Sequence, residues 1–208
     1  MQILWLFAFL LSEAGDPPSD FRPHKKEQNR EVTNISNQPI IFNITYTPWK
    51  VKSNATAEER AKFERERPYY EMSDSGNNIY KYMTSDRKLN GENSKTETRS
   101  LINYFEKSTG VFNGNGVITQ EQLKAIQQRA HAPKNIWHGF ISLNKEMSYK
   151  IDTPEKCMWL IKRTFGEFFK DMGLDPKNID LICALHKDKP HHLHIHFWFA
   201  EKEPKCKY

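Results

Sequence analysis

The chain has 208 residues, of which 38% are hydrophobic, and its formal net charge is +5. This composition suffices for one domain with one hydrophobic core, and the positive charge favours a polyanionic partner such as a nucleic acid. The three cysteines, Cys157, Cys183 and Cys206, show no paired spacing. They argue against a disulfide framework and indicate a reducing compartment, which we take to be the cytoplasm.

Residues 1–37 are predicted to lie outside the folded domain, which we expect over residues 38–208. The apolar run from Ile3 to Leu11 is too short to span a bilayer, and no Lys or Arg precedes it as in a signal peptide. It is an element that docks on the domain, a contact with a membrane surface, or the product of a wrongly assigned start codon. Residues 13–37 are polar and typical of a linker. Internal repeats and membrane spans are not predicted.

The first part of the domain is predicted to contain one strand and two helices. Residues 39–47 alternate apolar and polar side chains, as in a half-buried strand. Thr56 and Glu59 form a capping-box pattern, which opens a charged segment that we expect to end at Pro68. This segment is either a solvent-exposed helix or a projecting segment that faces DNA.

A short helix is predicted to start at Asp74. Its periodicity puts Ile79, Tyr82 and Met83 on one apolar face, with Tyr80 turned away. Residues 89–100 are expected to form a polar loop.

The second part is predicted to alternate helices and strands. A helix capped at Thr119 runs to about Ala132, and residues 135–143 form a buried strand. A long helix over residues 153–173 follows, with Pro154 at its first position and Gly173 at its end. Two strands complete the chain, over residues 179–186 and 193–199. This order predicts an α+β fold in which helices pack on one face of an antiparallel sheet.

Five of the eight histidines lie between His186 and His196, at the last two predicted strands. Alternate side chains of a strand share a face about 6.5–7 Å apart, so His194 and His196 form a two-ligand clamp for a metal ion. Residues 187–191 have turn chemistry, which would fold the two strands into a hairpin with His186 across from the clamp. Three imidazoles leave coordination positions open, as in catalytic sites. A histidine-rich tract that binds metal adventitiously is the alternative.

Other polar residues near this tract receive provisional roles. His192 and Asp188 are placed to orient a metal-bound imidazole, although a turn Asp needs no such role. The basic residues that flank the predicted site are placed to hold phosphates, or belong to a solvated surface. They are Arg87, Lys88, Lys187 and Lys189.

The spacing of His186, His194 and His196, followed by an aromatic run that ends at Pro204, resembles the third motif of conjugative and mobilisation relaxases of the HUH endonuclease superfamily. The chain is most similar to the Mob-L type of Gram-positive mobile elements. Further similarity lies in residues 79–87, 110–113 and 135–143, and the resemblance spans residues 39–204. It implies an antiparallel sheet with the histidines on central strands, around a divalent ion that is Mg, Mn or Zn.

The resemblance also implies metal-dependent, site-specific nicking and strand transfer of single-stranded DNA at an origin of transfer, with other conjugation proteins as further partners. An enzyme that cuts a strand and later rejoins it must keep the energy of the broken phosphodiester bond. This requires a covalent intermediate, which a phenolate can form at phosphorus. Tyr82 matches the position of the relaxase nucleophile best, with Tyr80 close behind and Tyr69 and Tyr70 weaker.

Three alternative functions remain. A rolling-circle replication initiator of the same superfamily shares the histidines and the tyrosine. A truncated relaxase would bind DNA or metal without nicking, since relaxases carry a further C-terminal region. A metallohydrolase with three histidines would activate water and need no tyrosine.

Overall fold

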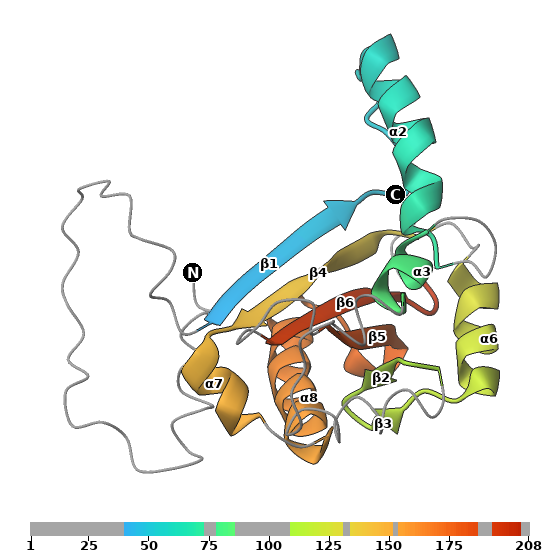
Figure 1. Ribbon diagram of the computed structural model, residues 1–208. Coiled ribbons are helices and arrows are strands. Elements are labelled where there is room, and N and C mark those ends of the chain that lie inside the picture. The colour runs from blue at the N-terminus through green and yellow to red at the C-terminus, as the bar shows by residue number, and fades with distance from the viewer. Residues whose placement is uncertain are drawn as a thin grey trace, which may run out of the picture.

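The structure is a computed structural model that describes residues 40–72, 78–85, 109–130, 134–151, 154–186 and 193–204. The described strands form one sheet in the order β1-β4-β6-β5-β2-β3, and all neighbouring strands are antiparallel (Figure 1). The strands are β1 (Ile40–Thr47), β2 (Phe112–Asn113), β3 (Gly116–Val117), β4 (Ile136–Leu143), β5 (Ile179–His186) and β6 (Leu193–Glu201). The helices are α2 (Ala57–Tyr70), α3 (Ile79–Met83), α6 (Gln120–Ala130), α7 (Lys145–Lys150), α8 (Pro154–Asp171) and the 3-10 helix η2 (Pro176–Asn178).

Helices cover both faces of the sheet. On one face, α8 packs its aromatic side chains against alternate residues of β6, from Leu193 to Phe199. On the other face, α3 and α6 pack against Ile182, Ala184 and Trp198. The α+β class and the antiparallel sheet are therefore confirmed, whereas the prediction that helices lie on one face is wrong. The physical reason is that β5 and β6 carry apolar side chains in both alternating sets, so both faces need cover.

The four long strands lie where the sequence predicts them, whereas shorter elements were not predicted. The hairpin of β2 and β3 has two residues per strand, too few to produce a period of two. Helix α7 has six residues and is capped by Asn144, whose side chain accepts a hydrogen bond from the Met147 amide at 2.9 Å. The predicted linker, the loop over residues 89–100 and the start of the helix at Asp74 lie outside the described residues.

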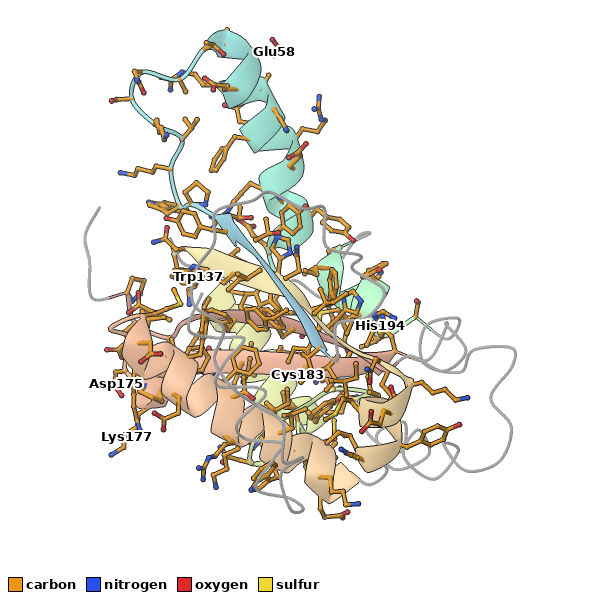
Figure 2. All side chains as sticks on the ribbon, turned by 90° about the vertical axis from the view of Figure 1, so that its left-hand side faces the viewer. Glu58, Trp137, Asp175, Lys177, Cys183 and His194 are labelled. Atoms are coloured by element: carbon orange, nitrogen blue, oxygen red, sulfur yellow. The ribbon has the colours of Figure 1, made fainter. Side chains whose placement is uncertain are left out.

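Helix α2 projects away from the sheet, with Glu58 at its distal end (Figure 2). The capping box of Thr56 and Glu59 is present. The prediction that this helix ends at Pro68 is wrong, because the helix continues to Tyr70. Pro68 therefore lies within the last turn of the helix, although it lacks the N–H that would donate to the carbonyl four residues earlier.

Arg67 is the one buried residue of α2 and anchors the helix to the sheet. Its guanidinium donates hydrogen bonds to the backbone oxygens of Pro48 and Lys134, pairs with Glu71 at 3.2 Å and lies over the Trp49 ring. A planar donor group with several fixed acceptors has little freedom. The end of α2 is therefore held in place, together with Tyr69 and Tyr70.

Cys157 of α8 and Cys183 of β5 lie buried as free thiols in the core between this helix and the sheet. Burial raises the pKa of the Cys183 thiol, and the neighbouring Cys157 raises it further. Cys206 lies outside the described residues. None of the described helices combines the length and the apolar character that a membrane crossing requires.

The backbones of β1 and β4 approach closely at Gly139. A Cβ at this position would lie 1.9 Å from the Asn43 oxygen and 2.8 Å from Cζ of Phe197. We predict that Gly139→Ala destabilises the fold by about 1–3 kcal/mol, because the methyl group overpacks the sheet. Gly166→Ala is the matched control.

A Cβ at Gly166, within α8, meets no atom within 4 Å. Its replacement should stabilise the protein by about 0.5–1 kcal/mol, since alanine is the better helix former. Urea unfolding of both variants measures the two effects. A Gly139→Ala protein as stable as wild type would contradict the close approach of the strands.

Candidate functional site

The histidines lie on the two central strands of the sheet. In the pairing of β5 with β6, His186 stands opposite His194 and Ala184 stands opposite His196. Because side chains alternate along a strand, all three histidines share the face that also carries Trp198. Figure 2 shows His194 near the end of the sheet where α3 lies. This placement is the geometry that the predicted hairpin requires.

His186 is fully buried and its ring is held by α3. Its Nε2 lies 2.7 Å from the carbonyl oxygen of Met83. A carbonyl oxygen only accepts hydrogen bonds, so Nε2 carries the proton. In the neutral ring the lone pair is then on Nδ1, which is the atom of His186 that can ligate a metal. Backbone carbonyls commonly orient metal-binding imidazoles in this way.

Tyr82 lies against the imidazoles. The centroid of its ring is 5.7 Å from that of His186 and 5.5 Å from that of His196, and both contacts are edge-on. The side chain is 38% exposed, so it faces solvent on one side and the histidines on the other. The structure thus brings Tyr82 together with two predicted site residues that lie more than a hundred positions later in the chain.

The predicted orientation of the two tyrosines of α3 is wrong. Ile79 and Met83 are buried, as predicted, but Tyr80 packs against the same core, and its hydroxyl donates a hydrogen bond to Thr109 at 3.5 Å. Burial raises the pKa of Tyr80. At about 100° per residue, Tyr80 and Tyr82 flank the apolar face on opposite sides. The periodicity could not tell which flank faces the core and which faces the histidines.

Tyr69 and Tyr70, at the end of α2, lie beside the same face of the sheet. The Tyr70 ring stacks on the imidazole of His138, with 4.1 Å between centroids, and contacts the Tyr69 ring edge-on. The Tyr70 carbonyl accepts a hydrogen bond from Trp198 Nε1 at 2.9 Å. Burial raises the pKa of Tyr69, and the nearby Tyr82 and Tyr70 raise it further.

His138 is a histidine that the sequence analysis did not single out. It stands on β4 opposite Trp198 and therefore shares the face of the other histidines. Its Nε2 is buried and has no hydrogen-bond partner among the described residues. Burial lowers the pKa of His138 to about 4, so this imidazole is neutral near pH 7. The available signal was a lone histidine within an apolar strand, which is more typical of a packed side chain than of a ligand.

Phe140, also on β4, stands opposite His196. The centroid of its ring lies 5.8 Å from that of His196 and 6.3 Å from that of His194. The His196 imidazole therefore has two aromatic neighbours, Tyr82 from α3 and Phe140 from β4.

The donor set suits a divalent ion, because imidazole nitrogens bind zinc and related metals well. In the structure, however, the rings of His186 and His196 lie 4.2 Å apart at 30°, closer to a stack than to two ligands of one ion. The described His, Cys, Asp and Glu side chains contain no group of three arranged around a common point for a metal. The chemistry of the three histidines thus fits a metal, and holding it requires their rings to turn apart.

The remaining predicted site residues lie outside the described part of the chain. They are Arg87, Lys88, Lys187, Asp188, Lys189 and His192. No family model, curated protein or solved structure matches the chain.

The burial of His138 predicts a pH dependence of stability. An unfolded histidine takes up a proton near pH 6.5, whereas folded His138 does so only near pH 4. Between these values the unfolded state binds more protons, so stability should fall as the pH falls from about 6.5 to about 4. In EDTA, the free energy of unfolding should decrease more steeply for wild type than for His138→Gln.

Proton NMR of the His138 imidazole provides an independent measurement of the same pKa. A titration midpoint near that of a free histidine, or equal pH slopes for the two proteins, would contradict the burial of a neutral ring.

Proposed function

We propose that the protein is a relaxase-type enzyme that nicks single-stranded DNA at an origin of transfer and transfers the strand through a covalent link to Tyr82. The observation that carries this proposal is the contact of the Tyr82 ring with both His186 and His196. A tyrosine beside a group of imidazoles on the central strands is what the chemistry of such a site requires. The net charge of +5 supports a nucleic-acid partner.

The proposed reaction exchanges one phosphodiester bond for another. Tyr82 loses its hydroxyl proton, and its oxygen forms a bond to phosphorus. The bond between phosphorus and the neighbouring sugar oxygen breaks, and that oxygen takes up a proton. The strand is then joined to the protein by a phosphotyrosine ester, and the reverse reaction with a sugar hydroxyl restores the DNA. Tyr82 is 38% exposed, and the proposed reaction requires a phosphate to reach its oxygen from the exposed side.

His186, His194 and His196 would hold a divalent ion, which is Mg, Mn or Zn. When bound, such an ion offsets charge on the non-bridging phosphate oxygens. His186 would contribute its Nδ1, because the carbonyl oxygen of Met83 occupies Nε2. Tyr82 directly precedes Met83 in the chain, so the hydrogen bond that orients this imidazole also restrains the position of the nucleophile.

The proposal includes the wider setting that the resemblance implies. The enzyme would act in the cytoplasm on single-stranded DNA, together with other conjugation proteins. Arg87, Lys88, Lys187 and Lys189 would contact phosphates, and Asp188 and His192 would assist the ligands. A rolling-circle initiator would form the same adduct at a different DNA site, whereas a non-nicking fragment or a metallohydrolase would form none.

We predict that Tyr82→Phe abolishes the covalent protein-DNA adduct. The variant keeps the ring that contacts the imidazoles and removes only the oxygen that attacks phosphorus. Its stability should change by no more than about 1 kcal/mol, the value of one hydrogen bond. The assay incubates the protein with a labelled pool of random single-stranded DNA and a divalent cation, followed by denaturing electrophoresis. Sequencing of the captured strands identifies the preferred site.

Tyr80→Phe is the matched control, because it removes a hydroxyl from the same helix on the side that faces the core. It should form the adduct as wild type does. Loss of the adduct in Tyr80→Phe but not in Tyr82→Phe would exchange the two roles. An adduct in both variants and in the double variant would assign the reaction to Tyr69 or Tyr70.

A further prediction concerns the metal. Replacing His186, His194 or His196 by Ala should each weaken the binding of Mn²⁺, measured by calorimetry. The loss should exceed the ~10- to 100-fold that removal of an orienting partner causes, because a two-point chelate remains. His191→Ala serves as the control in the same histidine tract and should bind nearly as wild type. Equal losses from all four replacements would contradict the three-histidine site.

A further inference from the structure

Phe140 is a large aromatic side chain that belongs to neither hydrophobic core. The α8-side core includes its chain neighbours Ile141 and Trp137, and the other core includes Ile136, but Phe140 packs in neither. It is partly exposed. Among the described residues its ring contacts are with His194 at 62° and with His196 at 40°, so neither imidazole stacks on it. The π face of Phe140 is therefore not stacked on any described ring.

The surface around Phe140 lies on the site side of the sheet and is mostly polar, with Ile41 of β1 as an apolar neighbour opposite Ser142. Strand pairing puts Asn43 of β1 on one side of Phe140 and His196 of β6 on the other. Ser142, the next residue of β4 on this face, stands opposite His194. Asn43 is exposed, and Ser142 and both histidines are partly exposed. We name this surface, made of Asn43, Phe140, Ser142, His194 and His196, the β4 shelf.

The described helices on this side do not extend over the β4 shelf. The core that α3 and α6 build includes Ile182, Ala184 and Trp198, which lie toward β5 and the far end of β6. Tyr70 covers His138, the neighbour of Phe140 on the other side along β4. The shelf thus begins where this cover ends, and it is continuous with the rings of His196 and Tyr82.

Polar side chains around one aromatic ring on a sheet surface suit an unpaired nucleotide. A base can stack on the ring, while amide and hydroxyl groups contact the sugar and the phosphate. A duplex has its bases already stacked and offers no such face. An apolar protein partner would instead need a larger apolar patch.

We infer that Phe140 stacks with an unpaired nucleobase beside the phosphate that reaches Tyr82, and that the β4 shelf carries the single strand into the site. This inference rests on the proposed function. It adds the residue that selects an unpaired strand at the reacting phosphate. Phe140 and Tyr82 both contact the His196 ring, so a base on one and a phosphate at the other can belong to neighbouring nucleotides.

The test measures binding of a fluorescein-labelled oligothymidylate by anisotropy, in EDTA and in the Tyr82→Phe background, so that no reaction occurs. Phe140→Leu keeps an apolar side chain and removes the π face, and we expect it to weaken binding about 5- to 150-fold, the range of one stacked base. Phe140→Tyr should bind as the parent does. Tyr149→Leu, which removes a 60% exposed ring from α7, is the control and should have no effect.

A second ligand, a strand of the same length made of abasic sites, separates stacking from a structural role. Phe140→Leu should bind it as tightly as the parent does, because there is no base to lose. Equal weakening for both strands would overturn the inference, as would unchanged binding of oligothymidylate or no binding by the parent protein.

The outcome is also independent of the nicking assay. A Phe140-dependent preference for bases without any Tyr82 adduct would leave the inference standing and refute the proposed function. An adduct that forms in wild type, with no effect of Phe140→Leu on binding, would refute the inference and leave the proposed function standing.

Discussion

The geometry of the site depends on one hydrogen bond, from Nε2 of His186 to the carbonyl oxygen of Met83. A fully buried imidazole is costly unless its polar atoms are satisfied, so this bond stabilises the end of β5. It joins residues 103 positions apart and ties α3 to the sheet. A helix of five residues has little stability of its own. The tertiary contact therefore holds α3, and with it Tyr82, against the imidazoles, and it fixes which nitrogen of His186 carries the lone pair.

The site lies where the second core ends. Along β5, the side chains on the α3 face change from Ile182 and Ala184 to His186, and along β6 they change from His196 to Trp198. The apolar part of each strand is covered by α3 and α6, whereas His194 and His196 are partly exposed and His186 is buried against α3. Rigid central strands thus present His194 and His196 at the border between core and surface, with His186 directly behind them. Arg67 secures the other border, because it fixes the end of α2 and the tyrosines that follow it.

Much of this arrangement was predictable from local patterns. The four long strands follow from their apolar content, and the hairpin of β5 and β6 follows from turn chemistry between two histidine-bearing segments. Contacts between distant segments were not predictable. The stacking of Tyr70 on His138 and the position of Phe140 depend on how β4 pairs with β6, which no local period encodes. The side of α3 that faces the histidines depends in the same way on the bond to His186. The error about the helix layers had a visible cause, since residues 179–186 are apolar on both alternating faces.

The central claim is that Tyr82 is the nucleophile that attacks phosphorus, and that the hydrogen bond between His186 and Met83 holds it in position. Peptide mapping of the protein-DNA adduct by mass spectrometry tests it most directly, because trypsin cuts after Lys81 and after Arg87 and isolates Tyr82 in a peptide without another tyrosine. The account predicts a nucleotide attached to the peptide from Tyr82 to Arg87, with the mass of a phosphotyrosine ester. A nucleotide on the peptide that contains Tyr69 and Tyr70, or the absence of any adduct with single-stranded DNA, would contradict it.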